Sequence, residues 1–461
     1  MSLVDPRTLL ATLLLLPLAA APVQRADLPT QYYVAPVPRG ASGGNGSRAR
    51  PWDLATALAG AGGRIQPGDT VWLTDGRYPG TFQTQLRGEA GRLIVFRQER
   101  GSRATIDGTL RTGGAYLAFW GFEIMQSNPT SGGYGLEART NAGRFINLVI
   151  HDAGTMGVSF WTPGEDAELY GCIVYNNGTH ENLDHGVYVH NERGTKRLAD
   201  NVFFTNLAYG IHAYAGPANV PQRNIWVQGN IAFNNGMISR RYRAKGNILV
   251  GGDVPMSGME VSSNFLYFSG TEGVNLRLGY APVSNDDVIA RGNFLWGGGT
   301  ALLLGQWRRA QVDGNTLGGA TELLDGAAEA FERTNLSYPL PRLPSAAAVF
   351  VRPNRYERGR AYIVAYNFPR QAELKADVAA VLTPGDAYEL RSVQDPFGPP
   401  LARGTYAGDS LALPMAEPVS PALPIGRPTA TPPTTRPLFD VFLLTLSGAA
   451  GPSGTHRAPS P

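Results

Sequence analysis

Seven short segments between Phe145 and Leu317 repeat one pattern of apolar and polar positions. In each, an apolar residue precedes two small or polar residues, an asparagine and a β-prone residue, and Cys172 once replaces the asparagine. The asparagines recur at intervals of about 22 to 34 residues, the length of one solenoid turn. An amide held at each bend can bond the neighbouring turn, so the pattern predicts an asparagine ladder. Its expected members are Asn147, Asn201, Asn230, Asn264, Asn293 and Asn315.

Between these segments lies a second repeated element, a glycine followed by alternating apolar and polar residues. It begins at Gly157, Gly186, Gly210 and Gly273, and in a looser form at Gly246 and Thr300. Glycine supplies the turn, and a period of two is typical of a strand with one buried and one solvated face. Two short strands per turn without a helical period predict an all-β fold, a parallel β-solenoid.

The first part of the chain carries an ordered series of short motifs. An apolar strand precedes a loop rich in glycine and serine, a short helix suited to plug the open end of a solenoid, a Gly-Asp-Thr-Val strand and a Gly-x-Tyr turn. They occupy residues 32–36, 40–47, 51–58, 68–73 and 76–80. Together with the repeats, over roughly residues 32–324, the series resembles the right-handed parallel β-helix proteins of the pectate-lyase-like superfamily. The resemblance implies that fold and the activity of a secreted polysaccharide lyase.

Composition divides the chain into five parts. The apolar run 9–21 follows Arg7 and ends in three alanines, which is typical of a signal peptide; an uncleaved anchor is the alternative. A proline-rich linker precedes short strands separated by turn clusters, which are typical of a small antiparallel β-sandwich. The predicted parts are a signal peptide (1–26), the β-helix (27–336), the linker (337–348), the β-sandwich (349–446) and a disordered tail (447–461). We expect the mature protein to be secreted or periplasmic, monomeric and free of the membrane.

The charge and the cysteine content exclude some classes of protein. The net charge is +3 over 461 residues, and no basic tract stands out. Signatures of nucleic-acid modules are absent as well, so no nucleic-acid partner is expected. The single cysteine permits no intramolecular disulfide.

The polar positions of the glycine-led strands carry an unusual set of side chains. Since the apolar positions are expected to point inward, stacked turns place the other positions in an outward strip, with about 4.8 Å between turns. Its members are Ser159, Trp161, Tyr188, His190, His212, Tyr214, Asn275 and Arg277. Flat rings suit pyranose faces and polar groups suit hydroxyls, so the strip predicts a sugar-binding groove. Alternatively, the histidines bond the backbone, and Trp161 and Arg277 only cover apolar surface.

A cluster of cations precedes the strand that begins at Gly246. Arg240, Arg241, Arg243 and Lys245 fall within six residues. Arginine holds a carboxylate through two parallel hydrogen bonds, and a cluster of cations attracts anions. The cluster therefore predicts an anionic glycan as the partner, such as one that contains uronic acid. A solvated loop without a ligand is the alternative.

These groups favour β-elimination in a uronic-acid polysaccharide. The reaction needs a base for the C5 proton, an acid for the leaving oxygen and a cation for the carboxylate. The candidates are His190 and His212 for the base, Tyr188 and Tyr214 for the acid, and Arg241, Arg243 and Lys245 for the cation. No acidic cluster suited to calcium accompanies them, so no cofactor or metal is expected. A C5-epimerase would use the same groups.

Two other functions remain open. A glycoside hydrolase needs two carboxylates about 5 to 9.5 Å apart, and Asp184 with Glu181, Asp253 or Glu260 could supply them. Of the hydrolase motifs of the superfamily, only the fragment Asp184-His185-Gly186 is present, and Asp184 is alternatively a turn residue. The third possibility is a non-catalytic glycan-binding or cell-surface solenoid.

Overall fold

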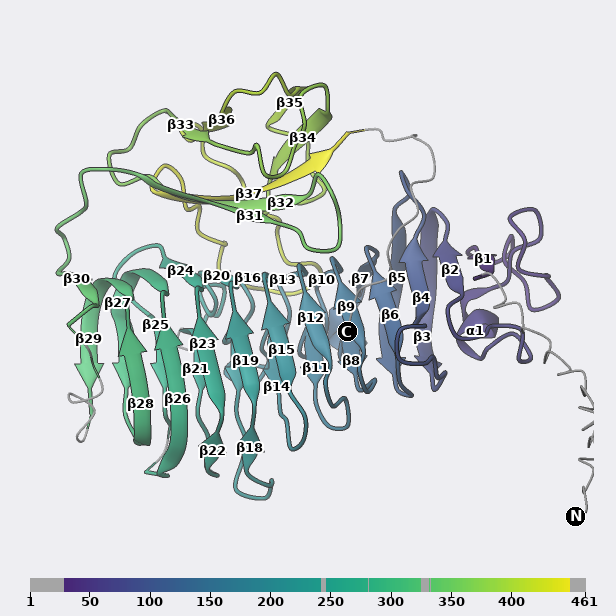
Figure 1. Ribbon diagram of the computed structural model, residues 1–461, viewed down its shortest axis with the longest axis horizontal. Coiled ribbons are helices and arrows are strands. Elements are labelled where there is room, and N and C mark those ends of the chain that lie inside the picture. The colour runs from purple at the N-terminus through teal and green to yellow at the C-terminus, as the bar shows by residue number, and fades with distance from the viewer. Residues whose placement is uncertain (1–28, 242–245, 281, 325–330, 332, 448–461) are drawn as a thin grey trace, which may run out of the picture.

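The computed structural model describes residues 29–241, 246–280, 282–324, 331 and 333–447. The predicted signal peptide and almost all of the predicted tail lie outside these residues. The described chain forms a long parallel β-helix with a small antiparallel sheet packed along one side (Figure 1). The predicted all-β class is thereby confirmed.

Each turn of the β-helix has three strands, not two as the sequence pattern predicted. The reason is that the asparagine-containing segment bends in its middle. It supplies the end of one strand and the start of the next, as in β9 (Arg144–Ile146) and β10 (Val149–His151). The β-helix therefore has three faces.

The first face is an 11-stranded parallel sheet. Besides β9, its strands are β1 (Gln31–Val34), β2 (Thr70–Leu73), β4 (Ile94–Gln98), β6 (Leu117–Trp120), β12 (Glu168–Tyr170), β15 (Lys196–Ala199), β19 (Ile225–Gln228), β23 (Met259–Ser262), β26 (Asn285–Arg291) and β28 (Trp307–Asp313).

The second and third faces belong to one 17-stranded sheet that bends along its length. The bend is visible in β5, whose first half pairs with a second-face strand and whose second half pairs with a third-face strand. The long strands that contribute to both faces are β3 (Gly76–Thr84), β5 (Ala104–Thr112), β27 (Phe294–Leu304) and β29 (Thr316–Leu323). The second face adds β7 (Glu123–Met125), β10, β13 (Ile173–Tyr175), β16 (Val202–Phe204), β20 (Ile231–Phe233), β24 (Phe265–Phe268) and β30 (Leu336–Tyr338). The third face adds β8 (Leu136–Ala138), β11 (Val158–Phe160), β14 (Val187–Val189), β17 (Ile211–Ala213), β21 (Gly246–Val250) and β25 (Val274–Leu278).

Small elements close the edges of the β-helix. Helix α1 (Leu54–Leu58) is capped by the Asp53 carboxylate and buries Leu54, Ala57 and Leu58 in the core, so it forms the expected plug. A short pair of strands, β18 (Gln222–Arg223) and β22 (Met256–Ser257), lies on the edge between the third and first faces, and η1 (Pro129–Ser131) precedes β8. No helix of the described residues has the length and hydrophobicity to cross a membrane.

The predicted asparagine ladder runs along the bend between the first and second faces. Each side-chain amide donates to the amide oxygen of the next turn at 2.8–3.2 Å, from Asn201 through Asn230, Asn264, Asn293 and Asn315 to Asn335. Cys172 takes the preceding position, and its N–H donates to Asn201 Oδ1 at 2.9 Å.

The prediction that Asn147 belongs to this ladder is wrong. Asn147 has a positive φ of 52° and corresponds to Gly171 of the next turn, at 65°, so Leu148 occupies the ladder position. Asparagine is one of the few residues besides glycine that tolerate this left-handed conformation. Its side chain points outward and donates to the Glu357 carboxylate at 2.9 Å.

A second asparagine ladder, which the sequence pattern did not predict, follows the bend between the second and third faces. Its amides are linked at 2.9 Å from Asn177 through Asn206, Asn235 and Asn247 to Asn275. Asn275 was expected to face outward and bind substrate. That expectation is wrong, because Asn275 is fully buried and also donates to the Gly297 carbonyl.

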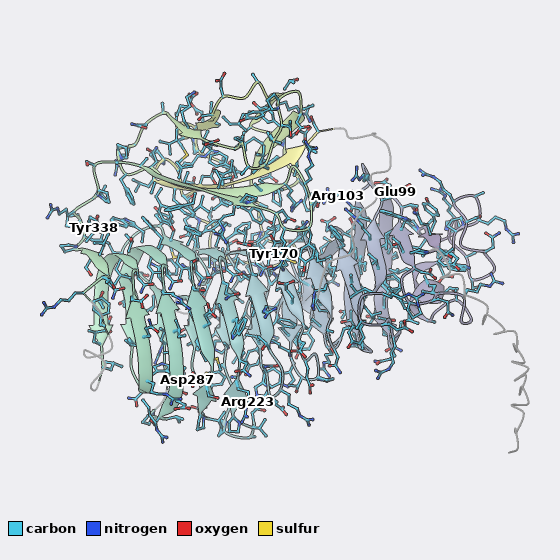
Figure 2. All side chains as sticks on the ribbon, viewed as in Figure 1. Glu99, Arg103, Tyr170, Arg223, Asp287 and Tyr338 are labelled. Carbon is cyan, nitrogen blue, oxygen red and sulfur yellow. The ribbon has the colours of Figure 1, made fainter. Side chains whose placement is uncertain are left out.

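The C-terminal sheet covers the second face. Five antiparallel strands pack their aromatic side against outward rings of the β-helix, and side chains fill the space between them, with Tyr170 at the boundary (Figure 2). A two-stranded sheet, β33–β36, encloses a separate core on the other side. The strands are β31 (Ala348–Pro353), β32 (Ala361–Tyr366), β33 (Glu373–Ala376), β34 (Ala387–Ser392), β35 (Ala402–Thr405), β36 (Leu411–Pro414) and β37 (Phe439–Leu446).

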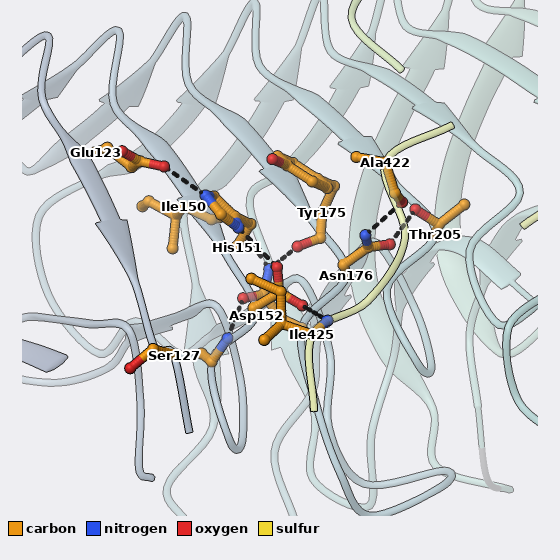
Figure 3. Close-up of polar contacts among 12 residues, drawn as sticks. Glu123, Ser127, Ile150, His151, Asp152, Tyr175, Asn176, Thr205, Ala422 and Ile425 are labelled. Atoms are coloured by element: carbon orange, nitrogen blue, oxygen red, sulfur yellow. Dashed lines mark hydrogen bonds and ion pairs between the residues drawn. The ribbon is translucent and has the colours of Figure 1, made fainter. Parts of the chain in front are cut away.

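Specific polar contacts fix the C-terminal sheet on the β-helix. Arg352 contacts the Asp200 carboxylate through Nε and Nη2 at 3.0 and 2.5 Å, and Tyr362 Oη donates to the Gly171 carbonyl at 2.7 Å. The segment that contains Ala422 and Ile425 passes beside the β-helix and forms two hydrogen bonds with it, both at 2.8 Å (Figure 3). The Ile425 N–H donates to the Asp152 carboxylate, and the Asn176 side-chain amide donates to the Ala422 carbonyl. The second face is thus covered, whereas the sheet leaves the third face uncovered (Figure 1).

Candidate functional site

The strand register of the third face aligns the predicted outward positions. Tyr188 of β14 pairs with His212 of β17, which pairs with Leu249 of β21, and Leu249 pairs with Arg277 of β25. The alternate positions Val187, Val189, Ile211 and Ala213 are fully buried in the core. The structure therefore brings together Tyr188, His212 and Arg277 on one face, as the sequence predicted.

The rings of this face form a continuous series of contacts. Trp161 lies 4.9 Å from Tyr188, Tyr188 5.3 Å from His212, and His212 stacks on Tyr214 at 5.0 Å between ring centroids. Tyr280 continues the series, edge-on to Tyr214 at 5.3 Å. We call these residues the aromatic strip: Trp161, Tyr188, His212, Tyr214 and Tyr280. Its side chains are half-buried, apart from the exposed Tyr280.

Sequence reasoning did not place three residues at this site: the strip member Tyr280 and two neighbours of the strip, His185 and Tyr209. His185 stacks on His212 at 3.9 Å, and Tyr209 lies 5.2 Å from His212. His185 and Tyr209 each stand directly before the glycine that opens a strand of the repeat, and Tyr280 stands directly after Gly279. That shared position was the signal that could have identified the first two.

His212 is held in its neutral form. Burial, and then the neighbouring His185, lower the pKa of His212 well below its ordinary value. Its Nδ1 is buried and has no hydrogen-bond partner among the residues that the structure describes. Burial also lowers the pKa of His185 to about 3, and its Nδ1 accepts the Tyr209 N–H at 3.2 Å. Both imidazoles are therefore uncharged at neutral pH.

The phenols beside His212 are held in their protonated form. Burial raises the pKa of Tyr188 to about 12. Burial and a hydrogen bond donated to the Asp253 carboxylate raise the pKa of Tyr214. The site thus combines one neutral imidazole with two neutral phenols, and a carboxylate fixes one of the phenols.

His190 lies beneath the strip rather than on it. The residue is only 1% exposed, the Trp161 ring stacks on its imidazole at 4.5 Å, and Nε2 lies 3.3 Å from the Val220 carbonyl. Burial lowers the pKa of His190.

The fully buried Lys196 lies near His190. Its Nζ lies within 3.1 Å of the Phe160, Trp161 and His190 carbonyls, and burial lowers the pKa of Lys196 to about 7.

The cation cluster is only partly described. The backbone N–H groups of Arg240 and Arg241 donate to the two Glu181 carboxylate oxygens at 3.0 and 2.9 Å, which ties their loop to the loop before β14. Both arginines are exposed. Arg243 and Lys245 lie outside the described residues.

The carboxylates proposed for a hydrolase have other roles in the structure. Asp184 is buried and accepts the backbone N–H groups of Thr179 and His180, so it is a turn residue. Asp253 accepts from Tyr214, and Glu260 lies on β23 of the first face. Among the described residues, no group of three or more His, Cys, Asp or Glu side chains is arranged to hold a metal ion.

A second polar cluster, unforeseen from the sequence, lies beside the C-terminal segment (Figure 3). His151 contacts Asp152 at 2.7 Å through Nδ1 and Glu123 at 2.8 Å through Nε2. Burial opposes the imidazolium charge, but the two carboxylates prevail and raise the pKa of His151. Since His151 is buried with both nitrogens engaged, this cluster anchors the Ile425 segment rather than offering a base to substrate.

Comparison with known proteins agrees with the fold. The family described as "Right handed beta helix region" matches residues 101–266, and no curated protein sequence matches the chain. The predicted right-handed parallel β-helix is therefore confirmed, and the protein is a right-handed β-helix protein.

Solved structures resemble the chain at low identity. Pectate lyase Pel9A is 17% identical over 65% of this chain and 81% of its own, with a TM-score of 0.46. An alginate lyase from Paenibacillus sp. is 18% identical over 67% and 97%, with a TM-score of 0.41. A lacto-N-biosidase from Eubacterium ramulus is 13% identical over 63% and 68%, with a TM-score of 0.39. These likenesses concern the fold, and the function is argued from the site.

Proposed function

We propose that this protein is a polysaccharide lyase that cleaves a uronic-acid-containing glycan by β-elimination, with His212 as the base. The observation that carries the proposal is the neutral imidazole of His212 in ring contact with two protonated phenols on an outward face. Half-buried aromatic rings along the same face offer surfaces for pyranose rings.

The base step depends on the charge of the substrate. A neutral imidazole can accept the C5 proton of a uronate, but burial makes His212 a weak base. A substrate carboxylate bound close to the ring favours the imidazolium and raises the pKa of His212 again. The base therefore becomes effective when an acidic sugar is bound, which favours uronates over neutral sugars.

Tyr188 is the better placed acid. As the bond from C4 to the leaving oxygen breaks and the C4–C5 double bond forms, the leaving oxygen takes the phenolic proton of Tyr188. The resulting phenolate is stabilised by the new imidazolium of His212, and proton transfer between these two neighbours restores both groups. Tyr214 is less suited, because its phenolate would face the Asp253 carboxylate.

Cations at the border of the strip complete the site. Arg240 and Arg241 precede β21, and their loop is held beside the loop that carries His185 through Glu181. We assign to them the attraction of the acidic chain and the neutralisation of the reacting carboxylate. From the sequence pattern of residues 1–26, we also propose that the protein carries an export signal and acts outside the cytoplasm.

Substitution of the two proton-transfer residues tests the proposal. The purified protein is assayed on polygalacturonate, alginate and other uronic-acid polysaccharides. His212→Gln and Tyr188→Phe are each expected to lower kcat by about 10²- to 10⁴-fold, the usual contribution of a general acid or base. The surface variant His180→Gln is the matched control, and circular dichroism verifies the fold. Loss of activity in His190→Gln with full activity in His212→Gln would contradict the assignment.

A further inference from the structure

Arg277 is an arginine of the third face without a carboxylate partner among the described residues. Other arginines on the β-helix form ion pairs, such as Arg103 with Glu123 and Arg309 with Asp286, and Arg277 forms none with a described carboxylate. Its Nε donates to the Gly279 carbonyl at 3.2 Å, and its guanidinium stacks over the Tyr280 ring at 4.6 Å. A half-buried guanidinium is thus held in a fixed orientation with capacity to bind an anion.

Tyr280 supplies an exposed ring directly beside this guanidinium. It is 39% exposed and is held edge-on against Tyr214, which stacks on His212. The strip therefore continues without interruption from His212 through Tyr214 and Tyr280 to Arg277. An exposed ring next to a guanidinium that contacts no described carboxylate matches a pyranose that carries a carboxylate.

The distance from His212 separates this position from the reacting sugar. Arg277 lies two turns from His212 along the register, which is about 10 Å at the spacing of parallel strands. One turn is close to the length of one sugar unit in an extended glycan. Two turns therefore correspond to about two sugar units.

We infer that Arg277 and Tyr280 form a subsite for an acidic sugar about two units from the cleaved bond, so that the glycan lies along the axis of the β-helix. The position of this sugar relative to the cleaved bond rests on the proposed function. The binding of an acidic sugar at Arg277 does not. The subsite predicts that affinity depends on chain length and on a carboxylate remote from the reaction.

Chain-length kinetics test the subsite. Wild type, Arg277→Gln and the control Arg291→Gln, an exposed arginine on the first face, are assayed on uronate oligosaccharides from disaccharide to hexasaccharide. For wild type, KM is expected to fall roughly tenfold at the first length that reaches Arg277, the value of a charged hydrogen bond to carboxylate. In Arg277→Gln this fall disappears, whereas it persists in the Arg291→Gln control, and Arg277→Lys restores only part of it. An equal rise of KM at every length, or no change, would overturn the subsite.

A binding assay separates this inference from the proposed function. In affinity electrophoresis, polygalacturonate or alginate in the gel is expected to retard wild type and the Arg291→Gln control more than Arg277→Gln. Neutral dextran in the gel is expected to leave the mobilities of the three proteins equally unaffected. If binding depends on Arg277 but no elimination occurs, the proposed lyase activity is refuted and the proposed subsite is supported. Elimination with no effect of Arg277→Gln in either assay would retain the lyase and refute the subsite.

Discussion

The buried His185 is expected to make the protein sensitive to acid, and the effect can be calculated. Burial lowers the folded pKa of His185 from 6.5 to about 3. Between these values the unfolded chain binds a proton that the folded chain does not, so the free energy of unfolding falls as the pH falls from 6.5 towards 3. Each pH unit in this window is worth about 1.4 kcal/mol. At about two units below 6.5, near pH 4.5, His185 lowers the free energy of unfolding by about 3 kcal/mol.

The variant His185→Asn tests this calculation. Asparagine retains an acceptor for the Tyr209 N–H but does not titrate. The free energy of unfolding is measured by urea denaturation at pH 7 and pH 4.5, and the difference between the two pH values is compared. We expect wild type to lose about 3 kcal/mol more than the variant between these two pH values. An equal loss of unfolding free energy in wild type and His185→Asn would refute the claim that His185, which stacks on His212, is a buried and uncharged imidazole.

Two further predictions concern the ladder and metal ions. Asn230→Ala removes the Asn230 Oδ1 acceptor of the Asn201 side-chain and backbone N–H groups and the donor to the Leu198 carbonyl. It is expected to lower the free energy of unfolding by about 2 to 6 kcal/mol, whereas Asn335→Ala at the half-exposed end of the ladder costs less. Equal losses in urea denaturation would contradict a continuous buried ladder. Turnover is expected to be unchanged after treatment with a chelator, because the proposed steps use only imidazole, phenol and guanidinium groups; loss of turnover that calcium restores would contradict this.

Much of the fold follows from local patterns in the sequence. The asparagines from Asn201 to Asn315 repeat at one bend per turn, and this period is a direct consequence of stacking. The glycine-led strands alternate because one side of each packs into the core. What the pattern concealed was the bend inside each asparagine segment, since residues on both sides of it are equally apolar. For this reason three strands per turn appeared as two.

Errors at single residues have similar physical causes. Asn147 looked like a ladder member, but it occupies the left-handed position one residue earlier, where asparagine and glycine are both tolerated. Asn275 lies between the apolar residues Val274 and Leu276, as an outward residue of an alternating strand would. It is buried because the second ladder extends to it, and long-range amide contacts of this kind leave no mark in the local alternation.

The sequence was sufficient to predict the face on which the candidate site lies, but not the burial and protonation states of its histidines. The strand register places Tyr188, His212 and Arg277 on one face, so the alternation of apolar and polar residues along the strands was sufficient to predict their shared position. From the sequence alone, His190 and His212 were equally good candidates for the base. Only the structure distinguishes the covered His190 from His212, because the distinction depends on Trp161 and on loops from neighbouring turns.

The central claim is that His212 removes a proton from a bound uronate. The most direct measurement is the product formed from a uronic-acid polysaccharide by wild type and by His212→Gln. We expect wild type to generate new chain ends with a C4–C5 double bond, seen as a rise in ultraviolet absorbance and verified by mass spectrometry, and His212→Gln to generate almost none. New reducing ends without the double bond, or undiminished elimination in His212→Gln, would contradict the account.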